Sequence, residues 1–248
     1  MSEQFQNVYA DETRAAAYAQ LGFPGTYYLA FRDLPEIMRT HVQGRVALDF
    51  GCGTGRSTRF LRDLGFNAVG VDIAAPMLAR ARDLDSSGDY RLITEGPLGG
   101  LLDGPFDLVL AAFTFDNIPT RERKGELLSD LRRVLRLSGR LVLVASTPNI
   151  YVHEWASFST RDFPENSASL EGGPVRIIML DVEDRRPVED VVCPDRVYRQ
   201  LFRAVGLRVL AMHLPLGRAS DGVAWVSETT VAPWAIYVLA PVEPEAAA

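Results

Sequence analysis

The stretch Val46-Ala-Leu-Asp-Phe-Gly-Cys-Gly-Thr-Gly-Arg56 decides the fold of this chain. An apolar segment typical of a buried strand leads into glycines at three alternate positions, Gly51, Gly53 and Gly55. Glycines at that spacing let the backbone pass close to a bound ligand, because no Cβ atom stands in the way. The dinucleotide fingerprint G-x-G-x-x-G fails here, since Arg56 and Thr58 stand where its third glycine would be. The pattern therefore predicts a ligand loop and disfavours a nicotinamide-dependent oxidoreductase.

A second strand and a second acidic residue follow at the distance of one strand–helix–strand unit. Residues 57–64 can form a helix that ends at Gly65, and residues 66–72 are typical of another buried strand. Asp49 and Asp72, each at the end of a predicted strand, are 72 − 49 = 23 residues apart. Because open α/β sheets bind ligands at the carboxyl ends of their strands, we expect both acids at the ligand edge. An acid at the end of the second strand can accept hydrogen bonds from both hydroxyls of a ribose.

The block Asp49-Phe-Gly-Cys-Gly-Thr-Gly55, with Asp72 and the predicted helix 73–82, resembles class I S-adenosylmethionine-dependent methyltransferases. The resemblance covers residues 45–147. It implies a doubly wound α/β fold, with a mostly parallel seven-stranded sheet whose last strand is antiparallel. It also implies methyl transfer as the activity, S-adenosylmethionine as the cofactor and S-adenosylhomocysteine as the product.

The same resemblance implies which residues hold the cofactor. The glycine loop would pass under the methionine and ribose portions, and Asp49 would orient that loop or bind the amino group. Asp72 would bind the ribose hydroxyls, and Arg56 would pair with either the methionine carboxylate or a helix end. Ile73 and Met77 would flank the adenine, with other residues at its edge and at the methionine end. The predicted cofactor-binding residues are Tyr28, Asp49, Gly51, Cys52, Gly53, Gly55, Arg56, Asp72, Ile73, Met77, Glu95, Gly96 and Phe113.

The predicted catalytic residues lie just after the fourth and fifth strands. His153 and Glu154 follow the fifth, and a histidine with a pKa near neutrality can take a proton from a hydroxyl or an amine. Their alternative role is to hydrogen-bond an insertion to the core. Asp116 and Asn117 follow the fourth strand, where they either bind a substrate amine or cap the turn before Pro119.

Aromatic side chains outside the predicted sheet are candidates for an apolar acceptor pocket. Packing of the same rings against the core is the competing interpretation. The predicted substrate-binding residues are Tyr28, Asn117, Tyr151, Trp155 and Trp225.

The chain is predicted to form one methyltransferase domain of five segments. Residues 1–42 form an N-terminal helical cap, with helices over 11–21 and 27–40, and residues 43–147 form the cofactor-binding core. Residues 148–193 form a β-rich substrate lid, with strands over 175–180 and 187–192. Residues 194–240 complete the sheet, and 241–248 are a tail.

Composition limits the function further. The net charge of −6 does not favour a nucleic-acid partner, and the three histidines and two cysteines lack the spacing of a metal site. Cys52 is a nucleophile or, as we prefer, a small residue suited to a tight loop. We see neither a signal-peptide pattern nor an apolar run long enough for a membrane span, so we expect a cytoplasmic protein, a monomer or homodimer, with no membrane partner.

The preferred function is methylation of a nitrogen or oxygen, less readily a carbon, of a small-molecule acceptor in specialised metabolism. Two rivals stay open at this point. One is a methyltransferase that acts on a macromolecule. The other is a regulator or scaffold that binds S-adenosylmethionine without transferring its methyl group.

Overall fold

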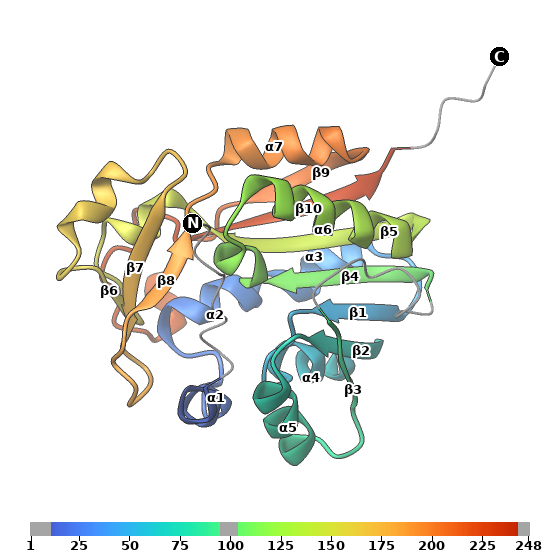
Figure 1. Cartoon of the computed structure of the whole chain (residues 1–248), viewed down its shortest axis with the longest axis horizontal. Helices are drawn as coiled ribbons and strands as arrows, with labels where there is room; N and C mark the ends of the chain where they lie inside the picture. The colour runs from blue at the N-terminus through green and yellow to red at the C-terminus, as the bar shows by residue number, and fades with distance from the viewer. Residues whose placement is uncertain (1–10, 95–103, 243–248) are drawn as a thin grey trace.

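A seven-stranded sheet forms the centre of the molecule, in the order β3-β2-β1-β4-β5-β10-β9 (Figure 1). The computed structural model describes residues 11–94 and 104–242. Neighbouring strands from β3 to β5 pair in parallel, whereas β10 pairs antiparallel with both β5 and β9. The predicted fold class is confirmed, including the antiparallel last strand. The strands of this sheet are β1 (Val46–Phe50), β2 (Asn67–Asp72), β3 (Asp89–Leu92), β4 (Phe106–Ala112), β5 (Leu135–Ser146), β9 (Leu207–His213) and β10 (Trp234–Pro241).

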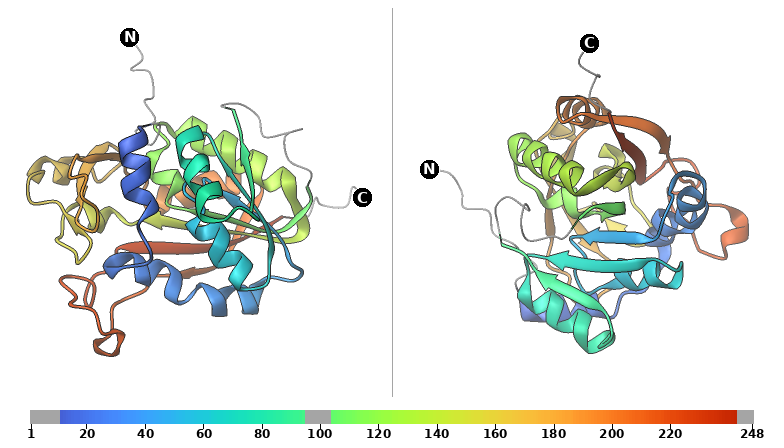
Figure 2. Two further views of the ribbon diagram at one scale, coloured as in Figure 1. Left: turned by 90° about the horizontal axis from the view of Figure 1, so that it is seen from below. Right: turned by 90° about the vertical axis from the view of Figure 1, so that its right-hand side faces the viewer.

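Helices cover both faces of this sheet (Figure 2). Because side chains alternate along a strand, Leu108 and Leu110 of β4 join one apolar core, while Val109 and Ala111 join the other. The first core contains side chains of α2 (Gly25–Arg32), α3 (Leu34–His41) and α4 (Arg56–Asp63). The second contains side chains of α6 (Arg121–Val134) and α7 (Asp195–Ala204), while α5 (Ala75–Leu84) contacts β2 and β3.

Within residues 11–42, the described part of the N-terminal cap, three short helices replace the two predicted. The first, α1 (Glu12–Ala19), begins at Asp11, whose side chain accepts a hydrogen bond from the Arg14 N–H at 2.8 Å. The second predicted helix, 27–40, is divided at Asp33 into α2 and α3. Pro35 explains the division, because proline has no N–H to continue the hydrogen-bond ladder of α2 and suits the first turn of a new helix.

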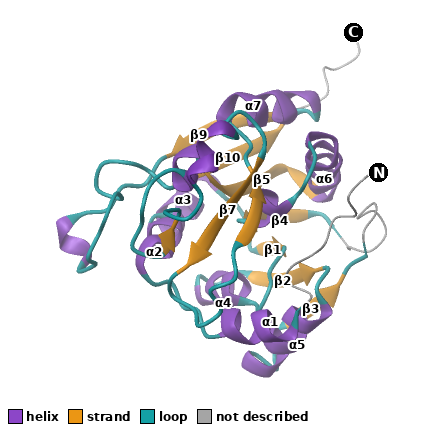
Figure 3. Cartoon of the chain, turned by 60° about the vertical axis from the view of Figure 1, so that its left-hand side comes forward, coloured by secondary structure: helices purple, strands orange, loops and turns teal. Residues whose placement is uncertain are grey.

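The insertion between β5 and α7 forms a separate three-stranded antiparallel sheet (Figures 1 and 3). Its strands are β6 (Phe158–Ser159), β7 (Pro174–Met179) and β8 (Val188–Val191), of which β7 and β8 were predicted. Alternate residues of β7, Val175, Ile177 and Met179, are buried in the same apolar core as α2. The insertion is therefore packed onto the main domain.

A cluster of four charged residues joins α1 to the turn between β7 and β8. Arg14, which is buried, contacts Asp184 through its Nε atom at 3.3 Å. Arg186 contacts both Asp184, at 2.8 Å, and Asp11, at 3.0 Å. We call Asp11, Arg14, Asp184 and Arg186 the α1–turn ion cluster. It ties the first helix of the cap to the insertion.

None of the helices that the structure describes combines the length and the apolar character that crossing a bilayer would demand.

Candidate active site

A large cavity of about 310 Å³ opens where the parallel strands end. Its wall includes residues that directly follow four strands: Gly51 after β1, Ile73 after β2, Ile93 after β3 and Phe113 after β4. The sheet order brings these four segments together, although they are far apart in the sequence. This is the edge at which open α/β sheets bind their ligands, and the volume is in the range of small-molecule sites.

The three glycines of the loop all adopt positive φ but have different surroundings. A Cβ atom on Gly51 would overlap the Thr114 side chain, and one on Gly55 would lie 2.6 Å from the hydroxyl oxygen of Tyr90. A Cβ atom on Gly53, at φ 53°, would meet no protein atom within 4 Å among the described residues. Gly51 and Gly53 line the large cavity. Gly53 therefore leaves space that a ligand can use, whereas Gly51 and Gly55 permit close packing within the protein.

Asp72 faces this loop from the end of β2 and lines the large cavity. One carboxylate oxygen accepts a hydrogen bond from the Gly53 N–H and the other from the Ala74 N–H, each at 2.8 Å. Burial raises the pKa of Asp72. A carboxylate oxygen has two lone pairs, so each oxygen keeps capacity for one further hydrogen bond. Asp72 thus fixes the loop and can still accept bonds from a ligand.

Asp49, at the end of β1, is buried behind the loop. Its Oδ2 atom accepts hydrogen bonds from the hydroxyls of Ser57, at 2.7 Å, and Thr58, at 2.6 Å. Its Oδ1 atom is buried without a hydrogen-bond partner in the described part of the chain. Burial raises the pKa of Asp49 to about 6. Asp49 lies behind the loop and not in the wall of the large cavity, so its charge can act on a cationic ligand there only at a distance.

Arg56 connects the glycine loop to the cap. Its guanidinium donates a hydrogen bond to the Gly22 carbonyl oxygen at 2.5 Å and lines the large cavity. The aromatic rings within 6 Å of its guanidinium carbon belong to Tyr18, Phe23, Tyr27 and Phe31. Contacts of this kind stabilise the cation. Arg56 therefore contacts both the cap and the large cavity.

The other predicted cofactor residues divide between the cavity wall and its surroundings. Ile73, Met77 and Phe113 lie in the wall, as does Cys52, whose buried thiol has a pKa raised well above its ordinary value by burial. A thiol of that kind is a poor nucleophile. The part of the wall that the structure describes does not include Tyr28, Asp49 or Gly55. Glu95 and Gly96 lie outside the described residues.

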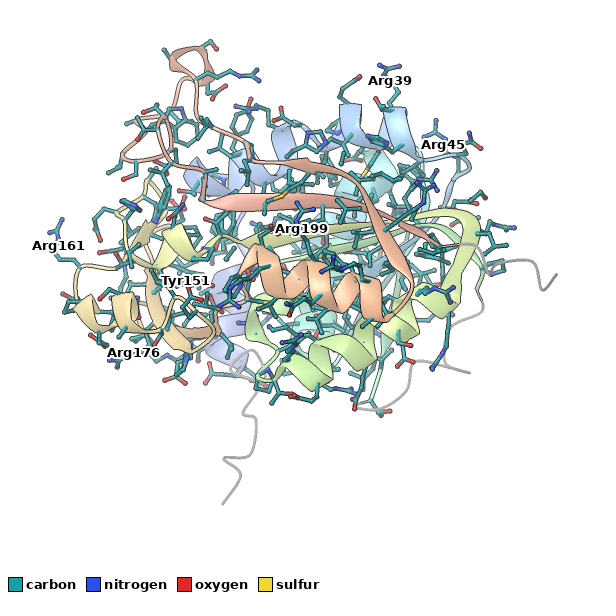
Figure 4. The ribbon with its side chains drawn as sticks, turned by 90° about the horizontal axis from the view of Figure 1, so that it is seen from above. Arg39, Arg45, Tyr151, Arg161, Arg176 and Arg199 are labelled. Carbon is teal, nitrogen blue, oxygen red and sulfur yellow. The ribbon has the colours of Figure 1, made fainter. Side chains whose placement is uncertain are left out.

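A second, smaller cavity of about 50 Å³ adjoins the first, and Tyr18, Phe113 and Asn117 belong to both walls. The small cavity lies between the core and the insertion. Its wall combines Asp116 of the turn η2 (Thr114–Asn117) and Tyr151 of η3 (Pro148–Tyr151) with residues of β7, β8 and β10. Tyr151, labelled in Figure 4, lies where the insertion meets the core, whereas Arg161 points outward at the far end of the insertion.

Phe113 separates the two cavities and has a strained backbone. Among the residues that the structure describes, Phe113 is the one non-glycine residue with a positive φ, at 64°. Its N–H donates to the Val144 carbonyl oxygen at 2.8 Å, and its ring contacts Tyr27 and Trp234, with centroid distances of 5.7 and 4.7 Å. Such strain persists only where the surrounding structure enforces it, as at ligand sites. The ring is thus held at the boundary between the two cavities.

The structure places His153 and Glu154 outside the walls of both cavities. The Glu154 carboxylate accepts hydrogen bonds from the Thr160 N–H, at 2.7 Å, and the Ser159 hydroxyl, at 2.9 Å. The His153 ring lies against Trp155 with a centroid distance of 6.0 Å. These partners all belong to the insertion itself, so the contacts of His153 and Glu154 hold the insertion together and do not join it to the core.

The aromatic candidates also differ in position. Tyr151 lines the small cavity, but Tyr28, Trp155 and Trp225 belong to neither wall. Trp155 is buried and donates its indole N–H to the Ile150 carbonyl oxygen at 2.8 Å, and Trp225 donates to the Arg218 carbonyl oxygen at 3.1 Å. For these two tryptophans, packing and internal hydrogen bonding account for the contacts that the structure shows.

Two residues beside the small cavity were not predicted. Asp190 of β8 lines it, and Lys124 of α6 is buried nearby with its ammonium on the Phe115 carbonyl oxygen. Both carry a signal in the sequence. Asp190 stands between Val188 and Val192 on the buried face of an alternating strand, and Lys124 precedes Leu127, Leu128 and Leu131 at the spacing of an apolar helix face. A charged residue in an apolar stripe is the feature that would have identified them.

Comparison with known proteins gives matches in sequence and in structure. The family described as "Methyltransferase domain" matches residues 48–143. A stretch of 187 residues is 29% identical to the 18S rRNA (guanine-N(7))-methyltransferase of Bos taurus, covering 64% of this chain and 66% of that one. This relative and an uncharacterized methyltransferase of Geobacillus, 27% identical over 146 residues, are each matched over about two thirds of their own length.

Solved structures match over most of the chain. The CcbJ methyltransferase of Streptomyces caelestis superposes with a TM-score of 0.66 at 17% identity, covering 96% of this chain and 99% of that one. The glycopeptide N-methyltransferase MtfA, solved with S-adenosylmethionine, gives a TM-score of 0.58 at 17% identity, covering 90% and 91%. At such identities the likeness shows a shared fold.

Proposed function

This chain belongs to the class I S-adenosylmethionine-dependent methyltransferase superfamily, and from that premise we propose that it methylates a nitrogen or oxygen of a small molecule whose reacting group enters the small cavity. The observation that carries the proposal is the junction of the two cavities, whose walls share Tyr18, Phe113 and Asn117. A cofactor in the large cavity and an acceptor in the small one would meet at this junction. In-line methyl transfer needs that arrangement.

In this proposal the cofactor occupies the large cavity. Its ribose hydroxyls donate to Asp72, its adenine lies between Ile73 and Met77, and its amino group is stabilised by Asp49. The open space at Gly53 accommodates the methionine and ribose portions of the cofactor. Arg56, already bonded to Gly22, attracts the methionine carboxylate while holding the cap over the cavity.

S-adenosylmethionine supplies a methyl group already activated on a sulfonium. The protein therefore has to align the acceptor, exclude water and remove a proton where the acceptor requires it. Phe113 and Tyr27 provide an apolar wall that excludes water, and aromatic faces also favour a cation nearby. Asp116 lies in the wall of the small cavity and is our candidate for the proton acceptor.

A small acceptor is favoured over a macromolecule by what surrounds the small cavity. The insertion and Tyr18 of α1 contribute to its wall, and the α1–turn ion cluster holds these two parts together. The chain's net charge of −6 adds electrostatic repulsion against nucleic acids. The existence of an acceptor cavity is also the reason to prefer an enzyme over a regulator that only binds the cofactor.

The proposal is tested by following the label from [methyl-³H]S-adenosylmethionine. The purified protein is incubated with an extract of its host cells, the mixture is filtered at a cut-off of about 1 kDa, and the filtrate is resolved by liquid chromatography so that unreacted S-adenosylmethionine is separated from labelled products. We expect a labelled product in the filtrate with the wild type, none with Gly53→Val, and wild-type amounts with His153→Ala. Label only in the retained fraction would indicate a macromolecular acceptor, and binding of S-adenosylmethionine without any transfer would indicate a regulator.

A further inference from the structure

The wall of the small cavity contains two carboxyl groups from distant parts of the chain. Asp116 of η2 is 7% exposed and Asp190 of β8 is 8% exposed. Asp116 accepts hydrogen bonds from the Ser146 hydroxyl, at 2.7 Å, and from the Ser146 N–H. Asp190 accepts from the Tyr151 hydroxyl, at 2.9 Å, and from the Asn117 amide, at 2.6 Å. These neutral donors fix both carboxyl groups but neutralise neither of them.

The positive charge near this pair is smaller than the negative charge. Within the described residues, neither carboxyl group forms an ion pair with an arginine, lysine or histidine. Lys124 is the cation that acts on both, and its ammonium donates to the Phe115 carbonyl oxygen. Two ionised carboxylates and one ammonium leave one negative charge uncompensated. Buried charges of this kind are stable only when they are paired or protonated.

Asp116 and Asp190 both titrate near neutral pH. Burial, with repulsion from Asp190, raises the pKa of Asp116 to about 7, and burial raises that of Asp190 to about 6. Burial lowers the pKa of Lys124. The remaining titratable groups near the pair, Tyr151, Cys193 and Tyr198, have their pKa values raised by burial and stay neutral. The two carboxyl groups therefore take up and release protons between about pH 6 and pH 7.

We propose that Asp116 and Asp190 select an amine as the acceptor and take its proton, with Lys124 as a positioning residue that limits the cluster to one excess negative charge. This inference rests on the proposed function and names its substrate class. A protonated amine brings the single positive charge that neutralises the cluster. An alcohol of the same shape brings none, and the apolar remainder of the wall, including Ile177 and Trp234, offers it no compensating charge.

For a primary amine, the reaction consists of one proton transfer to a carboxylate and one methyl transfer to nitrogen. The acceptor enters as R–NH₃⁺, and one carboxylate of the pair takes an N–H proton, which leaves R–NH₂ with a free lone pair. The lone pair forms the C–N bond to the methyl carbon while the C–S bond breaks and its electrons remain on sulfur. The products are R–NH₂⁺–CH₃ and neutral S-adenosylhomocysteine, and the carboxyl group later returns its proton to solvent.

The test compares amines with alcohols of the same shape on protein saturated with S-adenosylhomocysteine. The probes are n-propylamine, n-butylamine, cyclohexylamine and benzylamine, each paired with its alcohol, and binding is measured at pH 7.5 by ligand-observed NMR. We expect at least one amine to bind tenfold or more tightly than its alcohol. Asp190→Asn and Asp116→Asn, which keep the side-chain shape, should abolish this preference.

The matched control is Asp130→Asn, which removes another buried aspartate, paired with Arg133 at 2.6 Å and outside both cavity walls. It should keep the preference for amines. All variants should bind S-adenosylhomocysteine within twofold of the wild type, which also shows that they are folded. Lys124→Met should move the acid limb of the pH profile of amine binding upward by about one pH unit, since removing a positive charge raises the pKa of nearby carboxyl groups.

Three outcomes would overturn the inference: no preference for any amine in the wild type, a preference that survives in Asp190→Asn, or an unchanged pH profile in Lys124→Met. The failure of the proposed function has a different signature. It appears in the labelling experiment, as transfer only to retained macromolecules or as no transfer at all, or as a wild type that does not bind S-adenosylhomocysteine.

Discussion

At the scale of single residues, the loop glycines show how one backbone conformation serves two purposes. Gly51 and Gly55 allow Thr114 and Tyr90 to approach the loop, so a side chain at either position would disturb the fold. Gly53 has the same sign of φ but free space around it. A side chain at position 53 can therefore impair ligand binding without disturbing the packing of the protein around the loop.

Gly53→Val is expected to abolish binding of S-adenosylmethionine while the protein stays folded. The new side chain would occupy space proposed for the cofactor, and the positive φ would cost on the order of 1–2 kcal/mol of stability. Binding is measured by isothermal titration, and folding by circular dichroism and urea unfolding. Gly65→Val is the matched control, because Gly65 also has positive φ (83°) and free space but lies outside the cavity wall. Normal binding by Gly53→Val would remove the loop from the cofactor site.

The buried aspartates predict how stability depends on pH. The pKa is about 7 for Asp116, about 6 for Asp190 and about 6 for Asp49, against 3.8 for an ordinary aspartate. Between pH 4 and 7 the folded chain therefore holds protons that the unfolded chain has released. These three groups therefore contribute a free energy of unfolding that falls as the pH rises through this window.

Asp116→Asn should weaken that dependence, because asparagine has no proton to lose. Relative to the wild type, the variant should gain roughly 1–3 kcal/mol of stability between pH 5 and pH 8. Urea unfolding at the two pH values measures the change. A wild type that becomes more stable from pH 5 to pH 8 would contradict the argument.

At the scale of elements, the insertion and α1 enclose the small cavity from two sides. Their connection depends on Arg14, which is buried and whose Nε atom contacts Asp184 at 3.3 Å. The hydrogen bonds of Arg186 hold the pKa of Asp184 down to about 2, so this carboxylate is ionised at any pH at which the protein is studied. Removing its charge would leave the buried guanidinium without its ionic partner.

Asp184→Asn is therefore expected to loosen α1 from the insertion. Hydrogen–deuterium exchange followed by mass spectrometry should show residues 12–19 exchanging about tenfold faster, because local opening costs less free energy. Glu171→Gln removes one side of the exposed pair with Arg196 and should leave this exchange unchanged, since exposed ion pairs contribute little. Identical exchange in Asp184→Asn and the wild type would mean that apolar packing alone holds α1.

The elements also show what sequence analysis can supply. Strands β1, β2 and β5 and the glycine loop follow from local periodicity and from the backbone freedom of glycine, so the core and the cofactor edge could be predicted. The small cavity could not be, because it depends on a contact between Asn117 and Asp190, which are 73 residues apart. His153 and Glu154 were chosen for their place after β5, but the sequence did not reveal that Thr160 would turn back to bond Glu154.

At the scale of the whole molecule, charge and enclosure act together on the choice of acceptor. The net charge of −6 repels a polyanion at long range, and the insertion narrows the approach to the small cavity. We expect methyl transfer from labelled S-adenosylmethionine to ribosomal or transfer RNA to equal the protein-free blank at 0.15 M salt. Transfer that rises as the salt concentration is lowered would instead indicate electrostatic binding of RNA.

Lys124 is the single lysine of the chain, and it is 2% exposed. The folded protein thus presents no lysine side chain to an acylating reagent in solution. Acylation of Lys124 can proceed only while α6 and its neighbours are transiently open. The rate of acylation therefore measures how often this part of the fold opens. Because Lys124 is buried, one copy of the protein presents no lysine side chain to the active site of another. An enzyme that methylates amines would therefore not methylate its own lysine while it is folded.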